Sequence, residues 1–397
     1  MDYFKESLNL HKRLKGKIRM APKVDVRTKE DLSLVYSPGV AEPCKEIAND
    51  INAVWDYTIK SNTVAIVSDG SAVLGLGNIG AHASIPVMEG KAMLFKKFAN
   101  IDAFPICLDT QDVDKIVETV KIIAPVFGGI NLEDIAAPRS FEVEERLQDI
   151  GIPVFHDDQH GTAIVVLAAL INAAKVVKKS LFDLKVVING AGAAGIAIAK
   201  LLRCVGMEKE ESCVAVKDVI LCDSKGIVSK DRSDLNSAKI EILEHTNREN
   251  LSGDLKKAII DADVFIGVSV GNLLTAEDVS TMAKDSIIFG LANPIPEIMP
   301  EEAQKGGAAI VGTGRSDLPN QVNNVLGFPG IFRGALDAKA KRITNAMKLA
   351  AAFAIADNVR TPSADVIIPP TLNEQVAWDV AAAVKKAAIR ESENIAI

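Results

Sequence analysis

The chain has 397 residues, of which 48% are hydrophobic and 24% charged, a globular composition long enough for two domains. Lysine and arginine number 45 against 52 aspartate and glutamate residues, giving a formal charge of −7. We see no Lys/Arg cluster of the kind that a phosphate backbone requires, so we expect no nucleic-acid partner. The longest apolar run, 163–174, is interrupted by Asn172 and too short to cross a bilayer, so we expect no membrane partner. Five cysteines without CxxC spacing indicate neither a disulfide framework nor a zinc cluster, and we expect a cytoplasmic protein.

Strand-like apolar runs alternate with helical patterns along most of the chain. The runs are rich in valine and isoleucine, which is typical of parallel strands covered by helices on both faces. The predicted strands are 63–69, 102–109, 152–158, 184–190, 218–223, 262–270, 286–294 and 308–314. The sequence therefore predicts the α/β class.

An apolar helix is expected over about 162–179, beginning at Gly161 and Thr162 and leading into the run LKVVING. We place the domain boundary near residue 160, before this helix. The prediction is an N-terminal α/β domain, 1–160, and a C-terminal domain, 161–397, with a doubly wound parallel sheet and C-terminal helices.

The dinucleotide-binding pattern GxGxxG occurs twice, at 75–80 and at 190–195. At the second site the strand runs directly into the first glycine, and the helix that follows can present free N–H groups to a pyrophosphate. At the first site five residues separate the strand from the glycines. We therefore assign the cofactor to a Rossmann-like second site and regard 75–80 as a loop near the active site. The predicted cofactor contacts are Gly190, Gly192, Ala193, Ala194 and Gly195.

Asp223 closes the next predicted strand and is expected to bind the adenosine ribose hydroxyls, whereas Asp109 is the rival acid for the first fingerprint. The distance from the glycines to Asp223 is unusually long, and the charged stretch 208–217 is expected to form an extended surface connection. Asp223 favours NAD, but Lys225 could meet the 2′-phosphate of NADP. Both cofactors stay open, with NAD preferred.

Two acidic pairs, Glu133-Asp134 and Asp157-Asp158, are candidates for a metal site. Carboxylate oxygens suit Mg²⁺ or Mn²⁺, which prefer oxygen ligands. The alternative is that each pair is a solvated loop. Zinc is not expected, because the histidines beside the second pair lack HExxH spacing.

Seven segments of the sequence closely resemble the malic enzymes in their short bacterial and archaeal form, and they occur in the right order along the chain. They are YSPGVAEPC (36–44), SDGSAVLGLGNIG (68–80), PVMEGKAMLFK (86–96), GGINLEDI (128–135), FHDDQHGTA (155–163), ANPIPEI (292–298) and GTGRSDLPNQVNNVLGFPGIFRGAL (312–336). The resemblance runs from about residue 20 to about residue 385.

The resemblance implies metal-dependent oxidative decarboxylation of L-malate to pyruvate and CO₂, with reduction of NAD(P), by a homodimer whose N-terminal domain is catalytic. A malolactic-type lyase that makes lactate from malate with bound NAD is the alternative. The implied catalytic residues are Tyr36 and Lys91. Tyr36 would protonate the enol, and Lys91 would act as a base, because burial beside a cation would lower its pKa. The implied metal ligands are Glu133, Asp134 and Asp158, with Asp157 as a neighbouring acid.

The resemblance also implies that Asn293 and Asn324 meet substrate or nicotinamide. One departure concerns the second carboxylate of malate. Larger members of the family carry an arginine just before LGLG, where this chain has Ser71-Ala72-Val73. What replaces that arginine is left open.

Overall fold

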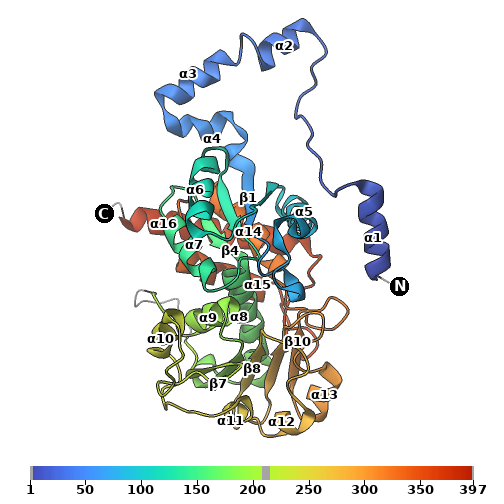
Figure 1. Cartoon of the computed structure of the whole chain (residues 1–397), viewed down its shortest axis with the longest axis vertical. Helices are drawn as coiled ribbons and strands as arrows, with labels where there is room; N and C mark the ends of the chain where they lie inside the picture. The colour runs from blue at the N-terminus through green and yellow to red at the C-terminus, as the bar shows by residue number, and fades with distance from the viewer. Residues whose placement is uncertain (1–2, 208–214, 396–397) are drawn as a thin grey trace.

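The computed structural model describes residues 3–207 and 215–395 and contains two β-sheets, which occupy the upper and lower halves of the molecule in Figure 1. Helices accompany both sheets, so the predicted α/β class is confirmed. Most of the charged stretch 208–217, expected as a surface connection, lies outside the described residues.

The N-terminal sheet has four parallel strands in the order β2-β1-β3-β4. The strands are β1 (Thr63–Ser68), β2 (Asp102–Cys107), β3 (Gly129–Leu132) and β4 (Val154–His156), accompanied by α5 (Gly80–Ala99), α6 (Val113–Ile123) and α7 (Arg139–Leu147). Strand β3 was not predicted, because its segment GGINL contains glycine and asparagine, which are typical of turns. It is nevertheless fully buried between β1 and β4.

The C-terminal sheet has six strands in the order β10-β9-β8-β5-β6-β7. They are β5 (Lys185–Asn189), β6 (Asp218–Asp223), β7 (Gly226–Ile227), β8 (Val264–Gly267), β9 (Ile287–Gly290) and β10 (Ile310–Thr313). Five strands are parallel, but β7 turns back antiparallel to β6 after a two-residue connection. The sheet is therefore mixed, where the sequence predicted a parallel one. Its helices include α9 (Ala193–Leu202), α10 (Ser237–Leu243), α11 (Leu255–Ile259), α12 (Ala276–Ser280) and α13 (Pro300–Lys305).

Helix α8 (Asp157–Val177) joins the two halves of the chain. It begins five residues before the predicted start, because Asp157 and Asp158 form its first turn, where carboxylates are favoured by the free N–H groups. The predicted boundary near residue 160 thus falls within a helix. Buried residues of α8 belong to one apolar core that includes side chains of both β1 and β5.

Among the described residues, α8 is the one helix whose length and composition would suit a membrane span, yet 72% of its apolar window is buried. Its polar residue Asn172 is also buried and donates to the carbonyl oxygens of Ala356 (2.9 Å) and Ile367 (3.0 Å). Because the protein itself satisfies this side chain, α8 is a core helix.

The last helices return to the N-terminal half of the molecule. They are α14 (Phe328–Asp337), α15 (Asn345–Asp357) and α16 (Glu374–Ile395). The ring of Phe95 in α5 packs against Phe328 and Phe332 of α14, with centroid distances of 4.8 and 5.4 Å. This packing fixes α14 beside the N-terminal sheet.

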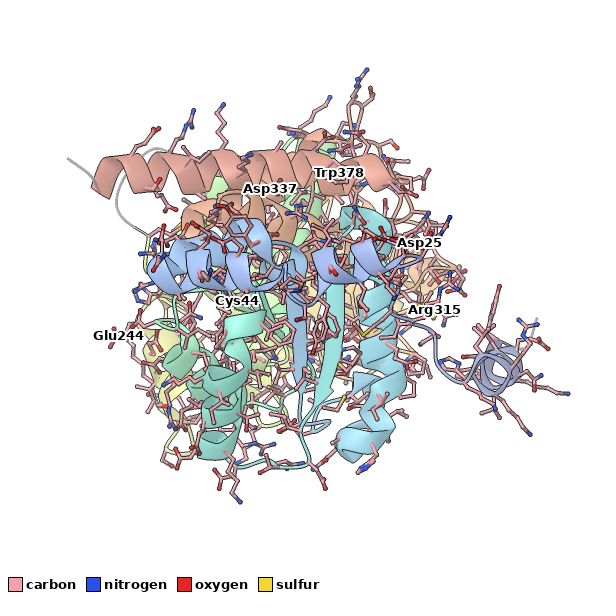
Figure 2. All side chains as sticks on the ribbon, turned by 90° about the horizontal axis from the view of Figure 1, so that it is seen from above. Asp25, Cys44, Glu244, Arg315, Asp337 and Trp378 are labelled. Carbon is pink, nitrogen blue, oxygen red and sulfur yellow. The ribbon has the colours of Figure 1, made fainter. Side chains whose placement is uncertain are left out.

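Residues 3–57 extend away from the two sheets (Figure 1), and α1 stands apart from the rest of the described chain in Figure 2. This segment contains α1 (Tyr3–Leu14), α2 (Lys29–Val35), α3 (Ala41–Asn49) and α4 (Val54–Tyr57). None of the four helices has a buried residue. We call residues 3–57 the N-terminal arm.

The cysteines depart in one respect from the sequence prediction. Cys44, Cys107 and Cys222 are free thiols, whereas Cys204 is disulfide-bonded. The sequence had indicated no disulfide framework.

Candidate active site

A buried ion-pair cluster of Lys91, Glu133 and Asp157, which we call the Lys91 cluster, lies at the edge of the N-terminal sheet where its strands end. Lys91 in α5 has its Nζ 2.8 Å from Glu133 Oε1 and also forms an ion pair with Asp157. Lys91 is 7% exposed, Glu133 6% and Asp157 0%. The same amine lies 4.0 Å from the ring centroid of Phe328. Three segments distant in the sequence thus hold one amine in place.

The topology explains why these side chains meet. Glu133 follows β3 directly and Asp157 follows β4, and the two strands are parallel neighbours. Their carboxyl ends therefore share one edge of the sheet, where ligands bind in open α/β sheets. Asn131 on β3 donates to Glu133 Oε2 at 2.8 Å and holds that carboxylate in position.

The three predicted metal ligands also come together. One carboxylate oxygen from each of Glu133, Asp134 and Asp158 lies within 4.8 Å of the others. Asp158 Oδ2 accepts the backbone N–H of Asp134 at 2.8 Å and lies 3.3 Å from His156 Nε2. This donor set consists of oxygen alone, which fits Mg²⁺ or Mn²⁺.

The electrostatics of the cluster also fit a cation. Burial raises the pKa of Glu133 to about 8, an effect that Lys91 only partly offsets. Burial likewise raises the pKa of Asp157 to about 6. Burial opposes the charge of Asp158 too, but His156, Lys91 and the backbone N–H of Asp134 together outweigh it and hold the pKa of Asp158 below its usual range. The cluster holds more carboxylate charge than one amine balances, and a divalent cation would remove the excess.

The pKa of Lys91 differs from the sequence expectation. Burial by itself lowers it, but the charges of Asp157, Glu133 and Asp158 outweigh burial and raise the pKa of Lys91 above its ordinary value. The expected lowering depends on a cation, because only then is part of the carboxylate charge withdrawn from the amine.

Asp157 has a more central position than the sequence indicated. Besides pairing with Lys91, it accepts a hydrogen bond from Nδ2 of Asn324, which lies in the short helix Asn324–Leu326. A Cβ at position 161 would come 1.8 Å from Asp157 Oδ1, so only glycine fits at that turn of α8. The sequence marked Asp157 only as the neighbour of Asp158.

Asn293, the other predicted asparagine, lies in the loop after β9 and is exposed. In the described part of the chain, its side chain makes no hydrogen bond to the Lys91 cluster. A Cβ at Gly75 would lie 2.6 Å from the Asn293 carbonyl oxygen, so the first glycine pattern reaches the loops of the C-terminal sheet. That pattern is therefore a contact between the two halves of the chain.

Tyr36 is not part of the cluster within its own chain. It follows α2 in the N-terminal arm and is 67% exposed. No hydrogen bond or ion pair between Tyr36 and Lys91 occurs among residues 3–207 and 215–395.

The second glycine pattern borders a cavity of about 1010 Å³ whose lining includes Gly190, Gly192 and Asp223. Helix α9 begins at Ala193, so its N-terminal N–H groups lie at the turn, with Ala194 next. Gly190 has a φ of +120°, and a Cβ at Gly195 would come 1.8 Å from the Gly190 carbonyl oxygen. The turn therefore requires glycine at both positions.

Asp223 already has two cationic partners at the border of this cavity. Arg232 donates to both of its oxygens, at 2.8 and 3.0 Å, and Lys239 Nζ lies 2.5 Å from Oδ2. Partial burial opposes the charge, but these bonds outweigh it and lower the pKa of Asp223 to about 2. No motif in the sequence marks Arg232 or Lys239. Lys225, the predicted contact for a 2′-phosphate, pairs with Asp234 at 2.8 Å.

Comparison with known proteins decides the family. The models for the malic enzyme N-terminal domain and the malic enzyme NAD-binding domain match residues 15–148 and 159–389. The chain belongs to the malic enzyme family. It is 60% identical over 393 residues to the bifunctional malic/malolactic enzyme of Bacillus subtilis, covering 98% of this chain and 94% of that protein.

Two further malic enzymes are similar over most of their length. The NAD-dependent malic enzyme of Geobacillus stearothermophilus is 55% identical over 378 residues, covering 94% of this chain and 77% of that one. The crystal structure of the NAD-dependent malic enzyme of Thermotoga maritima aligns with a TM-score of 0.91 and 51% identity, covering 96% and 98% of the two chains. The family assignment confirms the resemblance that the motifs indicated.

Proposed function

We propose that this chain catalyses the oxidative decarboxylation of L-malate to pyruvate and CO₂, with reduction of NAD(P). The observation that carries this proposal is the buried amine of Lys91, paired with Glu133 and Asp157 beside three clustered carboxylates. An amine of this kind can take a hydroxyl proton, and such carboxylates can hold a cation.

Glu133, Asp134 and Asp158 would hold Mg²⁺ or Mn²⁺, which when bound polarises the C2 oxygen of malate. Lys91 accepts the proton of the C2 hydroxyl, while the hydrogen on C2 leaves as hydride to the cofactor. The C3–C4 bond then breaks to release CO₂, and its electron pair forms the C2–C3 double bond of the enolate of pyruvate. Tyr36 donates the proton that C3 needs to give pyruvate.

The cofactor site proposed is the cavity beside Gly190 and Gly192, with the pyrophosphate at the N-terminus of α9. We propose NAD, with Asp223 accepting the ribose hydroxyls. The test compares kcat/KM for NAD and NADP in the wild type and in Asp223→Ala. A wild-type preference for NADP would contradict this choice.

We further propose a cytoplasmic homodimer. The exposed apolar side chains of the N-terminal arm support association with a second copy.

A malolactic-type lyase is the second candidate, because the Bacillus subtilis relative is a bifunctional malic/malolactic enzyme. Its product is lactate, formed without net NADH.

The deciding experiment incubates the protein with L-malate and Mn²⁺, with NAD and in parallel with NADP, and measures pyruvate, lactate and the reduced cofactor. Pyruvate and NADH in equal amounts are the expected result. Lactate without NADH would establish the lyase instead, and no consumption of malate with either cofactor would contradict both proposals. A parallel sample with EDTA shows whether turnover needs the cation.

A further inference from the structure

Two histidines flank the acidic pair at the start of α8, and the proposed reaction uses neither of them. His156 is fully buried at the end of β4, and His160 lies in the first turn of α8. Both contact Glu144 of α7. The backbone N–H of His156 donates to Glu144 Oε1 at 3.1 Å, and His160 Nε2 lies 2.9 Å from Glu144 Oε2. One carboxylate therefore holds the chain at both ends of this turn.

The ring of His160 is held from its other side by Lys348 of α15, whose Nζ lies 3.2 Å from His160 Nδ1. An ammonium group can only donate hydrogen bonds, so Nδ1 is the acceptor and the ring proton lies on Nε2. His160 Nε2 then donates to Glu144. We call Glu144, His160 and Lys348 the Glu144 network, which joins α7, α8 and α15.

The ring of His156 is oriented in the same way and meets a predicted metal ligand. Gln159 Nε2 lies 2.6 Å from His156 Nδ1 and 3.4 Å from Glu144 Oε2. An amide nitrogen only donates, so the ring proton of His156 lies on Nε2. That nitrogen lies 3.3 Å from Asp158 Oδ2. The position of Asp158 is therefore linked to Glu144 through His156.

The contacts of Asp158 distinguish its two oxygens. Oδ2 faces His156 Nε2 and also accepts the backbone N–H of Asp134 at 2.8 Å. Because both donors approach Oδ2, Oδ1 is the oxygen that is left for a cation. A rotation of the His156 ring would remove one of the two contacts that select this oxygen.

Glu144 keeps its charge although it is largely buried. Burial opposes ionisation, but the interactions with His160, Lys348 and His156 outweigh it and lower the pKa of Glu144 to about 2. The carboxylate is thus ionised at neutral pH and can accept hydrogen bonds at both oxygens.

We propose that Glu144 is a positioning residue of the metal site, which fixes His156 so that Asp158 presents Oδ1 to the cation. Lys348 contributes through the ring of His160. The inference rests on the proposed function, since the cation gives Asp158 its role. Partners that orient metal ligands from outside commonly change metal affinity by about 10- to 100-fold. The Glu144 network should therefore change metal binding without contacting the metal or the substrate.

Glu144→Gln tests this role while preserving the shape of the side chain. A glutamine cannot accept at both ends, because its Nε2 would face either the His156 N–H or the His160 ring. Calorimetric titration should show Mn²⁺ binding about 10-fold weaker than in the wild type. The Mn²⁺ concentration for half-maximal rate should rise in parallel, with an unchanged KM for NAD. Wild-type affinity for Mn²⁺ in a folded Glu144→Gln protein would overturn the proposal.

Asp263→Asn is the matched control. Asp263 also links a cationic side chain to a backbone N–H, accepting from Lys179 Nζ at 2.7 Å and from the N–H of Lys185 at 2.9 Å. Its side chain is 17% exposed, against 12% for Glu144. Asp263→Asn should lower the melting temperature but leave Mn²⁺ binding unchanged. Equal weakening of Mn²⁺ binding in the two variants would show a general loosening of the fold and overturn the positioning role.

Lys348→Met provides a second variant that is further from the metal site. It removes the donor to His160 and retains the Glu144 carboxylate, so Mn²⁺ binding should weaken less than in Glu144→Gln. If Glu144→Gln does not fold, an unchanged Mn²⁺ affinity in Lys348→Met would overturn the proposal. A wild type that does not bind Mn²⁺ would contradict the metal site and the proposed function. Equal binding by the wild type and Glu144→Gln would contradict the positioning role alone.

Discussion

The Lys91 cluster and the cofactor cavity balance their charges in opposite ways. In the cluster, burial and the charges of Asp158 and Asp157 raise the pKa of Glu133 to about 8, and Lys91 only partly offsets them. At the cavity, Arg232 and Lys239 lower the pKa of Asp223 to about 2. The first site is electrostatically incomplete without an added cation, whereas the second is already neutralised, so a bound cofactor competes with existing ion pairs.

Replacing Lys91 by methionine should have the largest effect on the first site. Because the substitution removes the proposed base, turnover should fall by roughly 1,000-fold, within the range for loss of general base catalysis. Steady-state kinetics with saturating malate, Mn²⁺ and NAD measure this loss.

Lys60 provides a matched control for Lys91. It is also buried, but its Nζ binds the carbonyl oxygens of Ala124 (3.2 Å), Pro125 (3.2 Å) and Phe127 (2.6 Å) rather than carboxylates. Lys60→Met should therefore lower the melting temperature but preserve kcat. Equal losses of kcat in the two variants would show that burial of an amine, and not its place in the cluster, matters.

Asp158→Asn should reduce turnover by about 100-fold and raise the Mn²⁺ concentration needed for half-maximal rate, since one ligand charge is lost. A Mn²⁺ titration of the initial rate measures both effects. Asp114, whose side chain is 83% exposed and pairs with Arg146, serves as the control, and Asp114→Asn should behave as the wild type. An Asp158→Asn enzyme with unchanged rate at low Mn²⁺ would remove Asp158 from the metal site.

Arg232→Ala should change cofactor preference by about 10-fold, the effect of one charged contact. Arg232 lines the cavity and is the strongest candidate there to meet a 2′-phosphate, so its loss should raise the ratio of kcat/KM for NAD over NADP. Arg248→Ala, at an exposed residue that does not line this cavity, should leave the ratio unchanged. A lower ratio in Arg232→Ala would show that Arg232 supports NAD instead.

Asp223→Asn should have the smallest effect, on stability in acid. The pKa of Asp223 is about 2 in the folded chain and about 4 when unfolded, so its charge stabilises the fold above pH 4. This contribution is lost as the pH falls from 4 to 2, and solvent screening limits it to about 1 kcal/mol. Urea unfolding at several pH values should show a shallower acid decline for Asp223→Asn. An unaltered decline would mean that the ion pairs contribute nothing.

The sequence was most informative where motif and topology agree. The strand before Gly190, the helix after it and the acidic pairs at strand ends are local patterns, and they predicted the C-terminal sheet and the clustered carboxylates. Strand β3 was not predicted, because the glycines and asparagine of its segment are typical of turns. Its burial between two neighbouring strands overrides that preference. The start of α8 was misplaced because the two acids were taken as strand and loop residues.

Long-range partners could not be predicted in this way. The role of Asp157 depends on a hydrogen bond from Asn324, which lies 167 residues away in the sequence. The partners of Asp223 lie beyond a hairpin that no motif marks. The resemblance assigned a role to Tyr36, but no local pattern indicated that its side chain is 67% exposed on the N-terminal arm.

The most direct test of the central claim is calorimetric titration of Mn²⁺ into the wild type and into Asp158→Asn, with Asp114→Asn as control. A buried excess of carboxylate charge predicts one ion per wild-type chain, binding at least 10-fold weaker in Asp158→Asn, and unchanged binding in the control. No binding by the wild type, or equal binding by Asp158→Asn, would contradict the claim that these carboxylates form the metal site.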